Sequence, residues 1–138
     1  MKRLSLVFLT AMTAAANAAP FDITDAWFRS LPGKLPAGGY FTVQNNTGRE
    51  VAITGASSEA CGMLMIHQSS NKGGMSGMSM MEKVVVPVGG IVRFAPGGTH
   101  LMCEQPKMKI GAKVPVLLHL SDGSAVAVGF AVKSATGK

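Results

Sequence analysis

Residues 114–132, VPVLLHLSDGSAVAVGFAV, decide the fold class of this chain. Two apolar stretches, 114–120 and 125–132, flank Ser121-Asp122-Gly123-Ser124, which is a strong turn signal. The pattern predicts an antiparallel hairpin. No stretch between residue 19 and this hairpin shows sustained helical periodicity, so the sequence indicates an all-β protein.

The rest of the chain contains further short strands separated by turn residues. Residues 38–43 are rich in aromatic and β-branched types, and we expect them to form a hairpin with 51–54 across the turn at 45–48. Two prolines make 31–36 a loop, and residues 73–81, GGMSGMSMM, are expected to form a flexible methionine loop. The other expected strands are 23–28, 61–67, 84–86, 91–94 and 100–103. Strands at intervals of roughly 8–12 residues predict a single-domain antiparallel β-sandwich or barrel.

The N-terminus predicts export. Met1-Lys2-Arg3 is a short basic start, residues 4–16 are mostly apolar, and Ala16-Asn17-Ala18 is a small-x-small cleavage pattern. The apolar run is shorter than the roughly 20 residues that a membrane-spanning helix needs. We therefore predict a cleaved signal peptide at 1–18 and a β domain at 19–138, and we do not expect a membrane-spanning protein.

Charge and motif content exclude several classes of function. Without Lys2 and Arg3, the net charge of +6 falls to about +4 with histidine neutral. The charges are scattered singly, so no basic stripe indicates nucleic-acid binding. The seven acidic residues are far apart, and the sequence has no Ser-His-Asp elbow or glycine-rich phosphate loop, so we do not expect an enzyme.

The two cysteines, Cys61 and Cys103, leave two interpretations open. In an oxidising compartment an even pair most often forms a disulfide. The alternative is that one or both thiols lie near a metal ion.

Histidine and methionine residues form the candidate site. His67 ends one expected strand. His100 and Met102 are two residues apart on another strand, so both side chains point to one face of the sheet, while Leu101 and Cys103 point to the other. The methionine loop can fold over the same end of the sheet. Imidazole and thioether donors suit a soft metal ion, above all Cu(I), whereas calcium and magnesium require oxygen and zinc seldom takes methionine.

Some residues of the same types have a simpler interpretation. Met63 and Met65 are expected to fill the core, because a methionine in a strand usually does so. His119 is expected to be a surface residue or a hydrogen-bonded polar residue. The methionine loop lacks core periodicity, and its alternative interpretation is a linker without a ligand role.

The spacing of the donors resembles that of a known family. His67, ten residues, Met78, twenty-one residues, His100, one residue and Met102 match the H-x10-M-x21-H-x-M signature of the periplasmic copper chaperones called PCu(A)C. The resemblance covers nearly all of 23–132. It includes landmarks in family order at 26–29 (AWFR), 37–43 (AGGYFTV), 45–48 (NNTG), 57–58 (SS) and 96–102 (PGGTHLM).

This resemblance implies both a structure and a function. The implied fold is a cupredoxin-like antiparallel β domain, and the implied Cu(I) ligands are His67, Met78, His100 and Met102. The implied function is periplasmic: to help load the CuA centre of cytochrome c oxidase, with a Sco-like thioredoxin-fold protein and cytochrome oxidase subunit II as associates. Binding of Cu(II) with rearranged ligands stays open. The choice of loop ligand also stays open, because Met78 has three methionine neighbours, Met75, Met80 and Met81.

Two other functions agree with parts of the sequence. An electron-transfer cupredoxin needs two histidines and a cysteine thiolate with a weak axial methionine. Cys61, His67 and Met75 follow part of that order, but the chain has no histidine before His67. The second alternative is a structural or adhesive β-sandwich without a metal ion.

Overall fold

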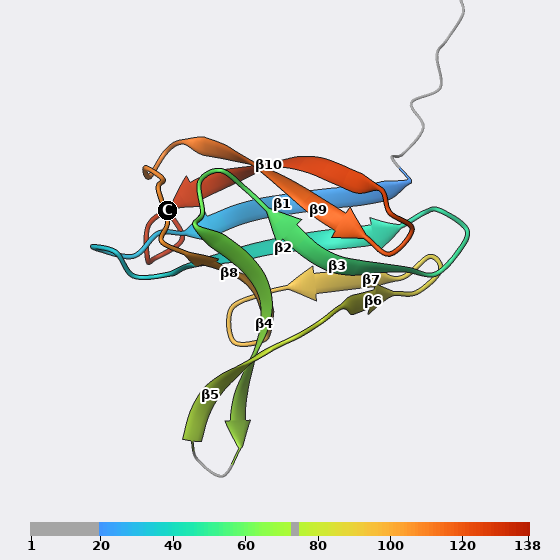
Figure 1. Cartoon of the computed structure of the whole chain (residues 1–138), viewed down its shortest axis with the longest axis horizontal. Coiled ribbons are helices and arrows are strands. Elements are labelled where there is room, and N and C mark those ends of the chain that lie inside the picture. The colour runs from blue at the N-terminus through green and yellow to red at the C-terminus, as the bar shows by residue number, and fades with distance from the viewer. Residues whose placement is uncertain (1–19, 73–74) are drawn as a thin grey trace, which may run out of the picture.

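The computed structural model describes residues 20–72 and 75–138, with side chains for 20–70 and 77–138. The described strands form one curled sheet (Figure 1), which confirms the predicted all-β fold. The predicted signal peptide lies outside the described residues. The strands are β1 (Phe21–Arg29), β2 (Ala37–Asn45), β3 (Val51–Ser57), β4 (Met63–Lys72), β5 (Met75–Met80), β6 (Val84–Val86), β7 (Ile91–Phe94), β8 (Thr99–Glu104), β9 (Lys113–Leu120) and β10 (Ala125–Lys133).

The order of strands across the sheet is β5-β4-β8-β2-β1-β10-β9-β3-β6, and β7 pairs with β2 beside β8. The described pairs are antiparallel except β1 with β10, which is parallel. The sheet curls so that β3 and β9 lie over β1 and β2 (Figure 1). No helix within the described ranges is long and apolar enough to span a membrane.

The core lies between the two sides of the curled sheet. Phe41 stacks on Phe94 with ring centroids 4.2 Å apart, and Phe28 lies 4.9 Å from Phe130. Buried and exposed residues alternate along β9, as expected for a strand with one face on the core. The hairpin predicted at 114–132 is confirmed as β9 and β10.

The predicted pairing of 38–43 with 51–54 is wrong. β2 already has β1 on one side and β7 and β8 on the other, so no edge is left for β3. β3 pairs instead with β9 and β6, on the opposite side of the fold. The turn after β2 therefore carries the chain from one layer to the other.

The predicted methionine loop is also different in the structure. Residues 75–80 form β5, which pairs with an extended β4 in a hairpin that projects from the body (Figure 1). Strand pairing uses backbone N–H and C=O groups, which glycine and serine supply despite their weak strand propensity. Because the strand propensity of glycine and serine is low, the sequence did not predict this strand.

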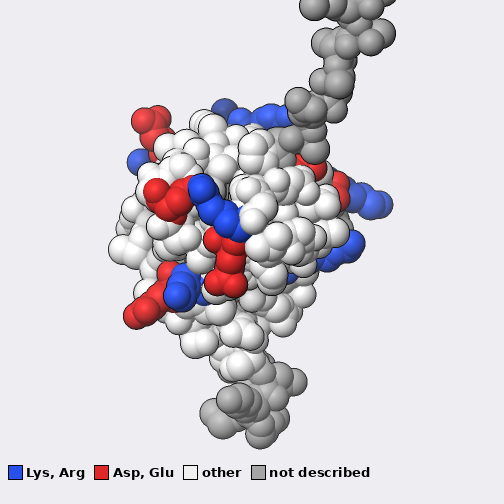
Figure 2. Space-filling view, turned by 90° about the vertical axis from the view of Figure 1, so that its right-hand side faces the viewer, with Lys and Arg blue, Asp and Glu red and all other residues white. Residues whose placement is uncertain are grey.

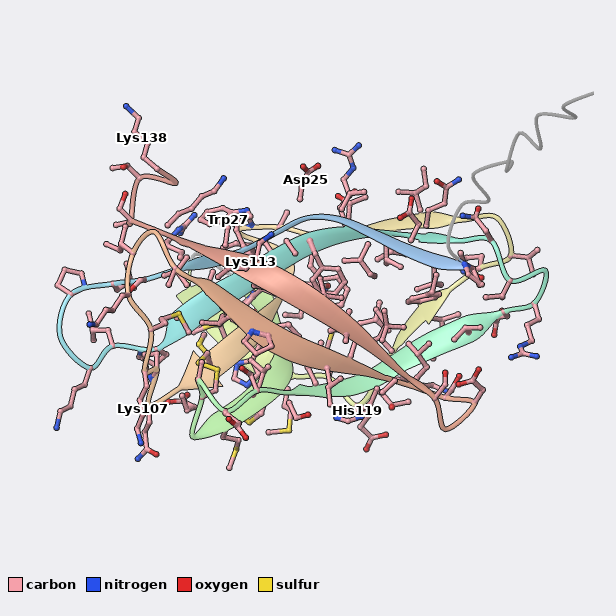
Figure 3. All side chains as sticks on the ribbon, turned by 90° about the horizontal axis from the view of Figure 1, so that it is seen from above. Asp25, Trp27, Lys107, Lys113, His119 and Lys138 are labelled. Carbon is pink, nitrogen blue, oxygen red and sulfur yellow. A yellow bond between two sulfur atoms is a disulfide. The ribbon has the colours of Figure 1, made fainter. Side chains whose placement is uncertain are left out.

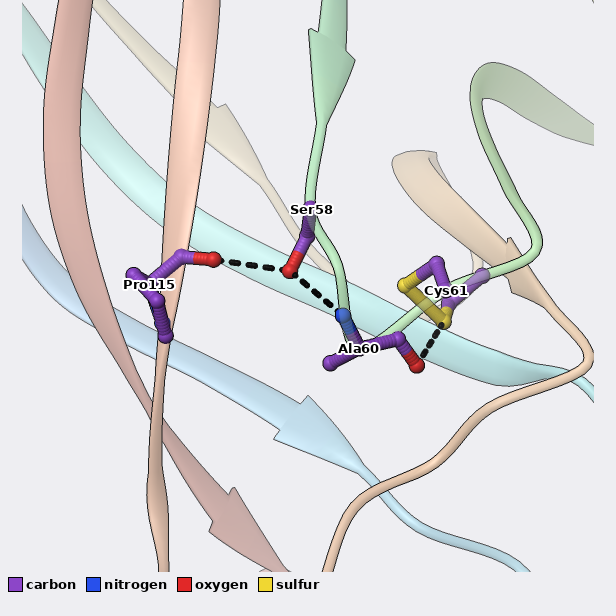
Figure 4. The surroundings of a disulfide bond; sticks show 5 residues. Ser58, Ala60, Cys61 and Pro115 are labelled. Carbon is purple, nitrogen blue, oxygen red and sulfur yellow. Dashed lines mark hydrogen bonds between the residues drawn. A yellow bond between two sulfur atoms is a disulfide. The ribbon is translucent and has the colours of Figure 1, made fainter.

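Cys61 and Cys103 form a disulfide with an S–S distance of 2.05 Å and a Cα–Cα distance of 5.3 Å. The expectation of a disulfide is thus confirmed, and a free thiol near a metal is excluded. The segment before Cys61 is fixed by Ser58, whose hydroxyl donates to the Pro115 carbonyl and accepts from the Ala60 amide (Figure 4). The disulfide joins the approach to β4 with β8, the strand beside it.

Asn45 is a fully buried polar residue at the end of β2. Its amide nitrogen donates to the carbonyls of Arg49 at 2.7 Å and Val86 at 3.0 Å, and its side-chain oxygen accepts from the Thr47 amide at 3.0 Å. Asn45 therefore holds the crossing turn against β6.

We expect Asn45→Ala to lower the free energy of unfolding by about 2–3 kcal/mol, because the substitution leaves buried backbone groups without partners. Urea unfolding followed by circular dichroism measures this loss. Gln44→Ala, at an exposed position next to Asn45 on the same strand, is the control. A loss below about 0.5 kcal/mol for Asn45→Ala would contradict the assigned role.

Candidate metal centre

The two candidate histidines lie side by side on neighbouring strands. The register of β4 and β8 pairs His67 directly with His100, and the ring centroids are 6.1 Å apart. Directly opposed residues of an antiparallel pair point to the same face of the sheet. His100 is only 5% exposed, whereas His67 is half-buried.

The opposite face of these strands belongs to the core. Leu101 and Cys103 are fully buried there, and Ile66 is 2% exposed. The alternation predicted around His100 is therefore confirmed. The face that carries the histidines lies outside the core, so polar and metal-binding side chains can occupy it.

Five methionines share this face with the histidines: Met63, at the start of β4, is remote from the histidine pair, and the other four are close to it. Met102 is two residues from His100, and Met65, directly opposite Met102, is two residues from His67. On β5, Met80 is paired with His67 and Met78 with Ser69. Positions two apart on a strand point the same way, so all four thioethers lie on the histidine side. We call this surface of β5, β4 and β8 the His/Met face.

The β5 methionines are the exposed members of the face. Met78 is 58% exposed and Met80 is 68% exposed. Met80, rather than Met78, is directly opposite His67 in the register. Met81 is partly buried against the core, where its sulfur accepts from the Thr99 hydroxyl at 4.0 Å. The side chain of Met75 lies outside the described side chains.

The interpretation of Met63 and Met65 as core residues is wrong. Met63 is 57% exposed, and Met65 lies half-buried on the His/Met face, outside the core cluster. Sequence reasoning gave Met65 no site role, although its distance of two residues from His67 was a usable signal. This signal was overlooked because Met65 lies within an apolar run, in which Leu64 and Ile66 do pack in the core.

The hydrogen-bonding state of the imidazoles fits a metal ion. Nδ1 of His100 is 2.9 Å from the carbonyl of Gly98. A carbonyl only accepts, so Nδ1 carries the proton and a neutral His100 presents the lone pair of Nε2. Both ring nitrogens of His67 are buried and have no hydrogen-bond partner among the described residues. Such groups are rare and need an explanation, and an ion coordinated by His67 would supply one for the nitrogen that carries the lone pair.

The available donors restrict the kind of ion. Within residues 20–72 and 75–138, no group of three or more His, Cys, Asp or Glu side chains is placed to hold a metal. The face that carries the two histidines also carries methionine thioethers beside them, which suit a soft ion. Both cysteines are in the disulfide, so the thiolate that a blue-copper site requires is absent and the electron-transfer alternative is contradicted.

An aromatic row continues the His/Met face across β2 and β1. The Tyr40 ring is 6.4 Å from the His100 ring and 4.9 Å from the Trp27 ring. The Arg29 guanidinium lies over Tyr40 at 5.4 Å, and Lys133 lies over Trp27 at 5.4 Å. Burial raises the pKa of the Tyr40 hydroxyl, and the charge of Arg29 offsets part of that rise.

Gly38 allows Tyr40 to lie flat beside the candidate donors. Gly38 pairs with Met102, and a Cβ atom on Gly38 would collide with the Tyr40 hydroxyl. The buried Tyr40 ring therefore borders the His/Met face on the side of β2. The open end is the β5 arm, whose methionines are exposed.

His119 does not belong to this face. It lies on β9, at the opposite edge of the molecule from Trp27 in Figure 3, and its Nε2 is 3.0 Å from the Ser57 hydroxyl. The prediction of an exposed or hydrogen-bonded residue is confirmed. The face drawn in Figure 2 carries acidic and basic side chains close together and shows no basic stripe.

The chain matches the family described as "Putative lipoprotein LpqE-like" over residues 21–132. A protein of Leifsonia xyli subsp. xyli (strain CTCB07), named "Putative lipoprotein Lxx21020", is 32% identical over 132 residues, which cover 93% of this chain and 78% of that protein.

Solved structures resemble the whole fold. The copper-bound PCuAC domain from PmoF2 has a TM-score of 0.70 and 22% identity, over 88% of this chain and 99% of that domain. The Cu(I) form of DR1885 from Deinococcus radiodurans has a TM-score of 0.67 and 27% identity, over 89% of this chain and 85% of that protein. The fold therefore defines a PCuAC-type β domain.

The chain belongs to the LpqE-like family, and the predicted resemblance to the PCu(A)C proteins is confirmed. PCuAC domains are not enzymes, so the prediction of a non-enzymatic protein is confirmed as well.

Proposed function

We propose that this protein is an exported carrier that binds one Cu(I) ion on the His/Met face and delivers it to a copper enzyme. The observation that carries the proposal is the pair of buried, partnerless nitrogens of His67 beside His100, whose Nδ1 is already bonded. A β-sandwich with no metal would leave the desolvation of His67 unexplained. The structural similarity to copper-bound and Cu(I)-bound PCuAC proteins supports copper as the ion.

The proposed ligands are two imidazoles and two thioethers. None of these donors is charged when it binds, and a neutral shell with sulfur favours Cu(I) over Cu(II). Binding needs no deprotonation of methionine, and methionine is not consumed by the disulfide chemistry of an oxidising compartment. The set is His67, Met78, His100 and Met102.

Export is supported by independent features. Disulfides such as Cys61–Cys103 are typical of oxidising compartments. The related family and the Leifsonia protein carry lipoprotein names, and the N-terminal residues 1–18 have the pattern of a signal peptide. We place the protein in the periplasm.

Delivery follows from the exposed β5 methionines. Met78 and Met80 can meet donors of a partner while the histidines still hold the ion, so the copper need not be released to water. The acceptor that the family resemblance suggests is the CuA centre of cytochrome c oxidase subunit II, with a Sco-like thioredoxin-fold protein as an associate. Incubation of the Cu(I)-loaded chain with the apo subunit II domain should then produce CuA absorption when a Sco-like protein and an oxidant for the centre are present. No CuA signal under these conditions would contradict the acceptor but not copper binding.

X-ray absorption on the copper-loaded protein tests the ligand set directly. We expect one copper per chain with both nitrogen and sulfur neighbours, two of each. A shell of nitrogen and oxygen alone, or copper at less than one equivalent, would overturn the proposed function.

We expect Met102→Leu to weaken Cu(I) binding roughly tenfold, which corresponds to about 1.4 kcal/mol. The substitution nearly conserves volume, so the melting temperature of the empty protein should hardly change. Competition with a Cu(I)-specific chelator under anaerobic conditions measures the affinity. Met108→Leu, at a methionine packed against the core, is the matched control, and equal affinities of the two variants would contradict the role of Met102.

A further inference from the structure

Met65 completes a second group of four donors on the His/Met face. The register of β4 and β8 contains two consecutive same-face pairs, Met65 with Met102 and His67 with His100. Opposed Cβ atoms in such pairs are roughly 4.5–5.5 Å apart, and residues two apart along a strand are roughly 6.6 Å apart. Two strands alone therefore bring two imidazoles and two thioethers to one patch.

Met65 and Met78 differ in how rigidly they are held. Met65 is half-buried on β4 directly opposite Met102 of β8, in the part of β4 that precedes the β5 arm. Met78 is 58% exposed on β5, the edge strand of the projecting arm. The disulfide holds β8 to the approach of β4 near Met65 and far from the arm. A site completed by Met65 is thus enclosed, and a site completed by Met78 is open.

We propose that Met65 is a copper ligand that alternates with Met78. The inference rests on the proposed binding of Cu(I) to this face. His67, His100 and Met102 are common to both donor sets. With Met65 the ion is held against β4 and β8, and with Met78 it is presented at the exposed arm for handover. Met80, opposite His67, is a further thioether on the open side.

The exchange is chemically balanced. One copper–sulfur bond to a neutral thioether breaks and another forms. No proton or electron moves, and the charge of the complex is the same before and after. The enclosed and open forms therefore differ only in which sulfur is bound and in how accessible the ion is.

Affinity and transfer rate separate the two methionines. We expect Met65→Leu to weaken Cu(I) binding only about twofold, as the loss of one of two comparably populated forms would, and to speed transfer to a chelator, because the enclosed form is lost. Met78→Leu should weaken binding by a similar factor but slow the transfer. Met108→Leu is the matched control for both. The double variant Met65→Leu/Met78→Leu should lose more affinity than the two single losses combined, since the single variants each keep one complete set.

A measurement on the unaltered protein makes the test independent of any variant's folding. With methionine methyl groups labelled with ¹³C, anaerobic addition of one equivalent of Cu(I) should shift the resonances of Met65 and Met102 and leave that of Met108 in place. An unmoved Met65 methyl in the copper-loaded wild type would overturn this inference while leaving copper binding intact, and so would wild-type affinity with a wild-type transfer rate in Met65→Leu. Failure of the wild-type protein to bind Cu(I) would overturn both proposals.

Discussion

The double substitution His67→Ala/His100→Ala is expected to reduce Cu(I) affinity by more than about 100-fold. Loss of a residue that merely supports a metal ligand typically costs 10–100-fold in affinity, so loss of both nitrogen donors should exceed that range. The two residues are cross-strand partners with rings 6.1 Å apart, and the remaining donors are thioethers. Chelator competition at fixed ionic strength measures the change.

His119→Ala is the matched control, since it removes an imidazole that lies on β9 and contacts Ser57. It should keep the wild-type affinity and one equivalent of copper. The double variant should also retain its β-sheet circular dichroism, because the core face of β4 and β8 is untouched. Wild-type affinity in the correctly folded double variant would show that copper binds elsewhere.

Removal of the disulfide by Cys61→Ala/Cys103→Ala is expected to lower the free energy of unfolding by roughly 4 kcal/mol. The two cysteines are separated by 42 residues, and closing a loop of that size removes this much conformational entropy from the unfolded chain in the loop-entropy account. Both positions lie at the joining of β4 and β8, so the His/Met face should also lose order. Urea unfolding of the oxidised wild type and the variant measures the difference.

Chemical reduction of the wild-type protein offers a second measurement without any substitution. It should produce a loss of similar size, because it opens the same loop. Alanine is chosen because Cys103 is fully buried, where a serine hydroxyl would add a desolvation cost of its own. A difference below about 1 kcal/mol in both experiments would mean that the disulfide hardly restricts the unfolded chain.

Local chemistry made some of the fold predictable from sequence. The hairpin of β9 and β10 follows from a turn in which the Asp122 carboxylate accepts a hydrogen bond from the Ser124 amide at 2.9 Å. Aspartate and serine at these positions are typical of such turns, so this interaction is predictable from the residue types. The pairing of β3 was not predictable in this way. It depends on which edges of the sheet are already occupied, and Asn45 fixes the crossing through partners as distant as Val86.

The candidate site was partly predictable for a similar reason. The period of two placed His100 and Met102 on one face without any tertiary information. The strand β5 was not predicted, because the glycine and serine residues in it have a low strand propensity. The position of Met65 depends on the register with Met102, which lies 37 positions further along the chain (102 − 65), so no local sequence signal reports it.

The burial of the His67 imidazole also bears on how firmly a metal ion would be retained. A buried polar group without a hydrogen bond costs about 1–3 kcal/mol. A metal ion that binds one ring nitrogen would remove the cost at that nitrogen, and every decrease of about 1.4 kcal/mol lowers the dissociation constant tenfold. The retention of copper by this chain would then depend in part on how poorly water reaches the ring, as well as on the bonds that the metal makes.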